Sequence, residues 1–133
     1  MTTSADHPNA VRVSNAYSKW FDGVISPMAT LLADDVVYHL PGNYLGGGDI
    51  CGFEELLARG RQYAPSFDGP SRTEIIDVVA NDHFAFTTER HIASRNGHKL
   101  DGIVCGVWRF DNDRATELWS HHADPAALAT LWP

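Results

Sequence analysis

The chain has 133 residues, of which 44% are apolar and 20% are charged. This length and balance are typical of one folded domain, so we expect a single domain over residues 1–133. Lys and Arg number 10 against 17 Asp and Glu, which gives a net charge of −7. An acidic chain of this kind excludes a nucleic-acid-binding module, because it has no cationic stripe to neutralise phosphates, and it disfavours an anionic membrane surface.

The sequence also indicates a compartment and argues against a bound metal. The opening segment lacks the apolar region of a signal peptide, and no apolar run is long enough to cross a bilayer. The two cysteines, Cys51 and Cys105, stand in no CxxC or zinc-type spacing. We therefore expect a cytoplasmic protein with both thiols reduced, no metal and no cofactor. The seven histidines titrate near neutral pH, which suits acid–base catalysis.

Three helices are predicted in the first half of the chain. Apolar residues recur at helical spacing over 9–21, and Ser26-Pro27 is typical of a helix start, which predicts a short second helix to about residue 33. The segment 53–63 (FEELLARGRQY) predicts a third, amphipathic helix. Between them, 36–40 (VVYHL) predicts a strand closed by Pro41-Gly42 and followed by a flexible glycine-rich loop over 42–49.

The second half of the chain predicts strands separated by turn signals. The β candidates span 73–80, 84–94, 99–110 and 116–123, and the segment 125–132 predicts a last helical turn or two. Helices followed by an antiparallel meander predict an α+β fold with helices across one face of a curved sheet. Such a cone has one open mouth, which is a natural pocket for a small molecule.

Two segments carry a resemblance to a known family. HLPGNYLGGGDICGFEELL and the stretch from ERHIASRNGHKLDG through VWRFDNDRATELWSHHADP resemble SnoaL-like proteins of the NTF2-like superfamily, and the match covers about residues 8–133. The resemblance implies an NTF2-like cone, in which a curved antiparallel sheet wraps around three N-terminal helices, and a homodimer. Relatives include polyketide cyclases, ketosteroid isomerase and epoxide hydrolases, so the fold alone does not give the reaction.

The last predicted strand supplies the candidate general base. Strand alternation places Trp119 and His121 on one face, and Ser120 and His122 on the other. The resemblance implies that the face of Trp119 and His121 looks inward, with His121 where relatives carry an Asp that acts as base. A neutral imidazole can take a proton near pH 7, so we expect His121 to be catalytic. The alternative is a core histidine satisfied by hydrogen bonds.

Arg90 is a second candidate, and it shares a face with Phe86, Thr88 and Ile92. It matches an Arg that epoxide hydrolases of the superfamily hold between two carboxylates. An inward Arg is costly unless paired, so it would bind a carboxylate or a substrate enolate; the alternative is a surface Arg. Ile92 stands where those hydrolases carry a catalytic Asp, which argues against their water-activating mechanism.

Two tyrosines are candidate hydrogen-bond donors. Leu40 and Gly106 stand where ketosteroid isomerase keeps two Asp, and only Tyr17 matches its oxyanion Tyr, which argues against steroid isomerisation. Tyr17 and Tyr38 can still donate to a carbonyl or enolate oxygen, although each also fits a structural role. His39 lies on the face opposite Tyr38 unless a bulge turns it inward, so it is a secondary candidate.

Apolar and aromatic side chains are expected to line the pocket, although most of them also fit a simple core role. The expected substrate-binding residues are Trp20, His39, Leu40, Phe53, Phe86, Thr88, Trp108 and Trp119.

Two functions fit these residues. The first is a cofactor-independent acid–base enzyme acting on a small hydrophobic metabolite, most simply a SnoaL-like cyclase or isomerase that closes a ring by an aldol-type or epoxide-opening step. The alternative is a non-catalytic NTF2-like domain that binds a small molecule or serves in dimerisation. Neither needs nucleic acid or membrane as a partner.

Overall fold

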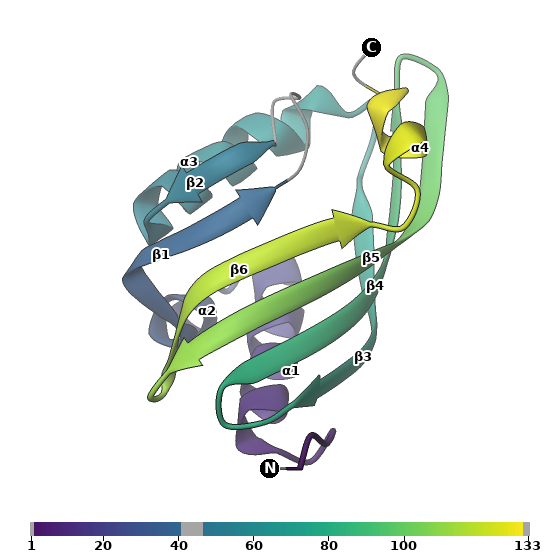
Figure 1. Cartoon of the computed structure of the whole chain (residues 1–133). Coiled ribbons are helices and arrows are strands. Elements are labelled where there is room, and N and C mark those ends of the chain that lie inside the picture. Colours follow the sequence, from purple (N-terminus) through teal and green to yellow (C-terminus); the bar gives the residue numbers. More distant parts are fainter. Residues whose placement is uncertain (1, 41–46, 132–133) are drawn as a thin grey trace.

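The structure is a computed structural model that describes residues 2–40 and 47–131 (Figure 1). The helices are α1 (Pro8–Phe21), α2 (Ser26–Leu31), α3 (Phe53–Tyr63) and α4 (Pro125–Ala129), and a 3-10 turn (Ala64–Ser66) follows α3. The strands are β1 (Leu32–Leu40), β2 (Gly48–Cys51), β3 (Arg72–Ala80), β4 (Phe84–Arg95), β5 (His98–Asp111) and β6 (Arg114–His122).

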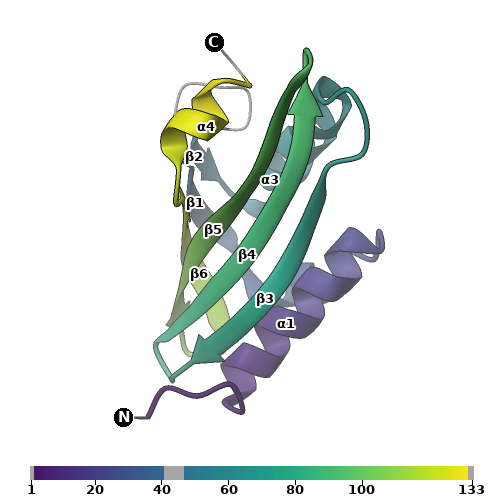
Figure 2. The same cartoon turned by 90° about the vertical axis from the view of Figure 1, so that its right-hand side faces the viewer.

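The strands form one six-stranded sheet in the order β2-β1-β6-β5-β4-β3. The last four strands form the expected antiparallel meander, and β1 joins it by running parallel to β6. The sheet is strongly curved, and α1 and α3 lie on the same side of it (Figures 1 and 2). The predicted α+β cone is therefore confirmed.

The helices cover different parts of the inner face of the sheet. Helix α1 packs on β3 and β4, and α3 packs on β1 and β2; Figure 2 shows α1 running beside β3. Val13 of α1 and Trp108 of β5 are almost completely buried in the main apolar cluster. A second apolar cluster lies around Leu128 and Leu131, which follow β6. The inner face between the two clusters is free to hold a cavity.

One strand was not expected. The segment 42–49 was predicted as a loop, but β2 occupies Gly48–Cys51 and pairs antiparallel with β1, burying Ile50. A four-residue strand that starts at a glycine with φ of +83° gives too short a pattern for recognition from sequence. Residues 42–46 of the predicted loop, and Pro41, lie outside the described residues.

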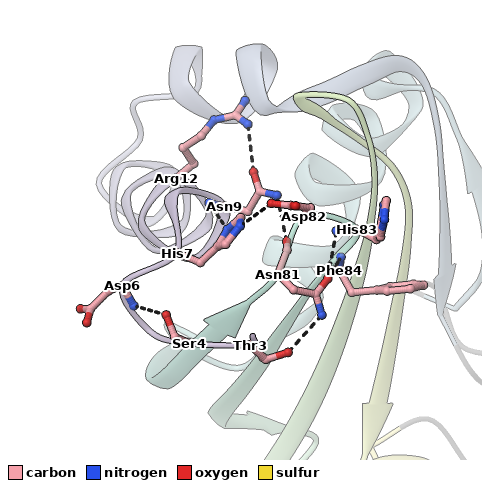
Figure 3. Close-up of polar contacts among 10 residues, drawn as sticks. All are labelled: Thr3, Ser4, Asp6, His7, Asn9, Arg12, Asn81, Asp82, His83 and Phe84. Carbon is pink, nitrogen blue, oxygen red and sulfur yellow. Dashed lines mark hydrogen bonds and ion pairs between the residues drawn. The ribbon is translucent and has the colours of Figure 1, made fainter. Parts of the chain in front are cut away.

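The N-terminus of α1 is fixed by an unusual cap (Figure 3). The backbone N–H of Asn9 donates to Nδ1 of His7 at 3.1 Å, so the ring proton sits on Nε2 and is donated to the Asp82 carboxylate at 2.8 Å. The side chain of Asn9 donates to the carbonyl oxygen of Asn81. These bonds tie the start of α1 to the turn between β3 and β4.

The cap predicts a stability effect. His7→Ala is expected to lower the free energy of unfolding by about 1 kcal/mol, because it leaves the Asn9 N–H without an acceptor. His7→Asn keeps a capping acceptor and should recover most of the loss. Asp82→Ala should have a much smaller effect, because Asp82 is 73% exposed. Urea denaturation of the three variants checks this order, and an equal loss in His7→Asn would contradict the capping role.

Candidate functional site

The inner face of the sheet is unusually polar where β4 crosses it. Alternation along β4 turns Thr87, Glu89 and His91 inward, and all three side chains are buried. On β6, Leu118 and Ser120 are buried and His122 is partly buried on the same face. The inner face therefore carries a carboxyl, two imidazoles and two hydroxyls within an otherwise apolar cone.

These side chains open onto a cavity of about 370 Å³ between the sheet and α3. It is lined by Trp20, Phe21, Tyr38, Leu40, Ile50, Leu56, Arg59, Gly60, Tyr63, Ala64, Ser71, Thr73, Glu89, His91, Val104, Ser120 and His122. A hollow of about 200 Å³ shares Trp20, Tyr38 and Glu89 with it and is also walled by Tyr17 and Trp108. The combined space is large enough for a ligand of small-metabolite size.

Glu89 is the central polar group of the wall. It is 6% exposed, and it forms no ion pair with any residue that the structure describes. The hydroxyl of Thr87 donates to its Oε2 at 2.7 Å. Burial raises the pKa of the Glu89 carboxyl, and the hydrogen bonds from Thr87 and Tyr17 offset only part of this effect. A carboxyl whose pKa moves towards neutrality is suited to proton transfer.

The two predicted tyrosines join this group. Tyr17 of α1 and Tyr38 of β1 are partly buried, and the Tyr17 hydroxyl hydrogen-bonds with both Glu89 and Tyr38. Burial, followed by the charge of Glu89, raises the pKa of Tyr17 well above its ordinary value. The phenol of Tyr17 therefore stays protonated at neutral pH. Thr87, Glu89, Tyr17 and Tyr38 form one connected network of hydrogen bonds.

Gly106 leaves the space that this network occupies. It lies opposite Thr87 in the β4–β5 pair. A Cβ atom at position 106 would stand 2.4 Å from Oγ1 of Thr87 and 3.2 Å from Oε2 of Glu89. Any larger residue at this position must displace the hydroxyl and break its bond to the carboxyl.

Gly106→Ala is accordingly expected to lower the free energy of unfolding by about 1–3 kcal/mol. The matched control is Gly102→Ala on the same strand, where the added Cβ meets Cδ1 of Leu100 at an ordinary 3.7 Å. That variant should stay close to the parent. Denaturant unfolding of both checks the prediction, and equal stabilities would show that the space beside Thr87 is not tight.

His91 and His122 form the second polar group of the wall. Their ring centroids are 5.9 Å apart, and the edge of Phe67 meets the ring of His91 at 6.1 Å. Burial, and then the nearby His122, lowers the pKa of His91 to about 4. Burial also lowers the pKa of His122. His91 is therefore a neutral imidazole at neutral pH, and the shift favours the neutral form of His122 as well.

The face assignment of the last strand is wrong. Trp119 and His121 point to the outer face of β6, where His121 is exposed and the ring of Trp119 stacks on His39 at 5.3 Å. The inward residues are Leu118, Ser120 and His122. The cavity therefore has an imidazole on β6, one position further along the chain than predicted.

The face assignment of β4 is wrong in the same way. Arg90 lies on the outer face and donates from Nε and Nη2 to the Asp101 carboxylate, at 2.7 and 2.6 Å. This pairing lowers the pKa of Asp101. Phe86 and Thr88 share that face, with Phe86 38% exposed. None of the three reaches the cavity.

His39 stays on the outer face, and the bulge that was considered does not turn it inward. Its Nδ1 lies 2.9 Å from Oδ1 of Asp49, and its Nε2 lies 2.8 Å from Oε2 of Glu117. The bond to Glu117, followed by that to Asp49, raises the pKa of His39. This cluster ties β2, β1 and β6 together, outside the cavity.

The remaining predicted residues do lie around the cavity. Tyr38, Leu40 and Trp20 line the cavity itself, and Tyr17 and Trp108 line the adjoining hollow. Phe53 stands behind this wall, with its ring against that of Trp20 at 6.4 Å. The structure thus brings together the tyrosines and the apolar wall but leaves the predicted base, His121, outside the cavity.

Glu89, His91 and His122 were missed by the sequence prediction. A signal was present, because Ala85 and Ala93 share the face of Glu89 and both are fully enclosed. Alanine is among the residues most often fully buried, so this alternation indicates that the face of Glu89 points inward.

The structure also bears on metal binding and membrane insertion. Within 2–40 and 47–131, no three His, Cys, Asp or Glu side chains gather in a way that could hold a metal ion. The helices that the structure describes include none that is long and apolar enough to span a membrane.

The curved sheet, the helices on its inner face and the cavity between them define an NTF2-like cone. Residues 13–118 match the model of the SnoaL-like domain, and the chain belongs to this family. Uncharacterized protein Rv0034 of Mycobacterium tuberculosis is 29% identical over 133 residues, covering 99% of each chain.

Solved structures share the same cone. Bal32a, from a soil-derived mobile gene cassette, superposes with a TM-score of 0.84 and 26% identity, covering 94% of this chain and 96% of its own. IdmH of Streptomyces antibioticus, described as a candidate polyketide cyclase, gives a TM-score of 0.71 and 18% identity, with coverages of 94% and 99%. The likeness to IdmH concerns the fold alone.

Proposed function

We propose that the protein is a cofactor-independent acid–base enzyme that acts on a small apolar carbonyl compound, as a SnoaL-like cyclase or isomerase. The observation that carries the proposal is Glu89, a buried carboxyl without an ion-pair partner among the described residues, on the wall of a cavity of about 370 Å³. An isolated buried carboxyl is costly to keep, and its raised pKa suits it to exchange a proton with a substrate.

The proposed reaction begins with Glu89 taking a proton from a carbon next to the carbonyl group. Electron density moves to the carbonyl oxygen, to which Tyr38 donates a hydrogen bond once its single phenolic proton turns from Tyr17 to the substrate. Glu89 then returns its proton: a conjugated enolate takes it at another carbon, which is isomerisation, or the enolate attacks a second carbonyl of the same molecule and the new alkoxide takes it, which is ring closure. The cavity favours ring closure by holding the chain folded.

The lining supports an apolar substrate. Trp20, Leu40, Ile50 and Leu56 contribute to the wall, and they would exclude water from the reacting carbon. Exclusion of water strengthens each hydrogen bond to the developing oxyanion. The family membership and the name given to IdmH point to the same class of reaction.

Proton exchange with solvent is the experiment that tests this function. A panel of enolisable cyclic ketones is incubated with the protein in D₂O, and deuterium at the α carbon is followed by mass spectrometry. We expect saturable exchange above the buffer rate, with an acidic limb lying above pH 4.5, the ordinary value for a glutamate, because the pKa of Glu89 is raised. Ketones that bind, detected by tryptophan fluorescence, without any exchange would indicate a binding protein instead.

A homodimer formed through the outer face of the sheet, and a cytoplasmic location, stay predictions. The dimer is supported by Phe86 and Ile103, which are each 38% exposed on that face. Sedimentation equilibrium measures the oligomeric state directly.

A further inference from the structure

Three polar side chains on the cavity wall have no hydrogen-bond partner among the residues that the structure describes. Ser120 and His91 are each 8% exposed, and His122 is partly buried beside them. Among the residues of 2–40 and 47–131, none hydrogen-bonds to the Ser120 hydroxyl or to a ring nitrogen of either histidine. Their polar atoms are not sealed within the protein, because Nε of Arg114 is the buried side-chain atom without a hydrogen-bond partner among the described residues. All three residues line the cavity, so their hydrogen-bonding groups are open to a ligand that enters it.

The contrast with the Glu89 network is informative. Thr87, Tyr17 and Tyr38 already bond to Glu89 or to one another, so that part of the wall is organised without a ligand. The unpartnered groups extend from it across and along the sheet, because Ser120 stands across Gly106 from Thr87 and His122 lies two strands away in the row of Glu89. His91 follows Glu89 by two residues on the same face of β4, a displacement of about 7 Å along the strand. The wall therefore offers two separate polar positions to one ligand.

The second polar position is formed by residues of β4 and β6, which lie on either side of β5. His122 of β6 pairs with Val104, which in turn pairs with Glu89, and Ser120 pairs with Gly106. Gly106 pairs with Ser120, and Gly102 pairs with His91. Neither glycine has a side chain that would stand between its partner and the cavity. The imidazoles reach across this gap to a ring separation of 5.9 Å.

The chemistry of this position selects a neutral oxygen. A neutral imidazole offers one N–H donor and one nitrogen acceptor, and a serine hydroxyl does both, so the three groups can bind a hydroxyl or a carbonyl oxygen. They carry no positive charge to balance a carboxylate. Arg59, the cation on the wall, already donates to the carbonyl of Gly47 at 3.1 Å and lies 3.8 Å from Glu55.

We propose that His91, His122 and Ser120 bind a second oxygen substituent of the substrate, remote from the carbon that reacts at Glu89. The substrate class that follows is an uncharged, largely apolar ring compound with two oxygen functions at opposite ends, such as a phenolic ketone. One oxygen is activated by the tyrosines, and the other fixes the orientation of the molecule. This inference rests on the proposed function for its account of the first oxygen.

Binding of a matched pair of probes tests the proposal without relying on turnover. 2-Tetralone has one oxygen, and its 6-hydroxy derivative adds a second at the far end of the rings. We expect the hydroxylated probe to bind about 3- to 10-fold more tightly to the unaltered protein, which is the effect of one or two hydrogen bonds. His122→Phe and Ser120→Ala should each reduce this preference, and the double variant should abolish it.

Glu54→Gln, which removes an exposed carboxylate in the first turn of α3, is the matched control, and it should keep the full preference because it leaves the cavity unchanged. Circular dichroism and thermal melting establish that each variant is folded, and Ser120→Ala gives a test should His122→Phe not fold. Equal binding of the two probes by the unaltered protein, or an undiminished preference in the double variant, would overturn the proposal. Preference without α-carbon exchange would instead refute the enzyme and leave the second position standing.

Discussion

Glu89→Gln is expected to lower kcat/KM by about 10²–10⁴-fold on any substrate that the protein turns over, with the fold intact. The amide has nearly the same shape as the carboxyl and can still accept the hydrogen bond from Thr87, but it cannot take a proton at neutral pH. The measurement is steady-state turnover, or the rate of α-carbon deuteration of a ketone that proves active.

The control and a second readout make this prediction specific. Glu54→Gln removes an exposed carboxylate in the first turn of α3, outside the cavity, and should change kcat/KM less than two-fold. Because the burial of the Glu89 carboxyl is unfavourable, Glu89→Gln should also melt at the same or a higher temperature than the parent. A variant that retains parental activity would exclude Glu89 as the base.

The stability of the protein should fall in mild acid because of His91. Its pKa is about 4 in the folded chain and near 6.5 when unfolded, so between these values the unfolded chain binds a proton that the folded chain does not. The contribution of neutral His91 to the free energy of unfolding is complete above about pH 6.5 and is lost as the pH falls to about 4. The free energy of unfolding should fall by about 3 kcal/mol over this range. His91→Gln should remove this dependence.

Comparison of variants is needed because Glu89 acts in the opposite direction. Its raised pKa contributes stability at low pH, and this contribution is lost as the pH rises through the folded value. Subtracting the unfolding free energy of His91→Gln from that of the parent at each pH isolates the histidine. From pH 7 to pH 4, the free energy of unfolding of the parent should fall by about 3 kcal/mol relative to that of His91→Gln. His122→Gln should show a change in the same direction, and a flat difference for His91→Gln would contradict the assignment.

Much of the fold could be predicted from the sequence. The predicted helix over 53–63 coincides with α3, the strand over 84–94 is one residue shorter than β4 at its end, and the strand over 99–110 is one residue shorter than β5 at each end. These segments carry strong local signals, such as the Asn96-Gly97 turn, where both residues adopt positive φ. Strand β2 could not be predicted, because its burial depends on the edge of β1 and not on its own pattern.

The site could be predicted only in part, because the usual rule for strand faces is inverted here. Along β4 the inward residues include Glu89 and His91, whereas the outward ones include Phe86 and Ile92. A hydrophobic pattern assumes a packed interior, and it fails where the interior is a cavity that requires polar groups. On the last strand the inward face was inferred from the resemblance, and a difference of one residue in register exchanges the two faces completely, which is why His121 was expected in place of His122.

The polar inner face has a consequence for how variants of this protein would respond to selection. Heat-resistant mutants should accumulate apolar replacements at His91 and Ser120, since each removes the penalty of a dehydrated heteroatom without breaking a hydrogen bond to a described residue. The same replacements would erase molecular recognition. A deep mutational scan for thermal tolerance would thus outline the working surface of the cone without a substrate in hand.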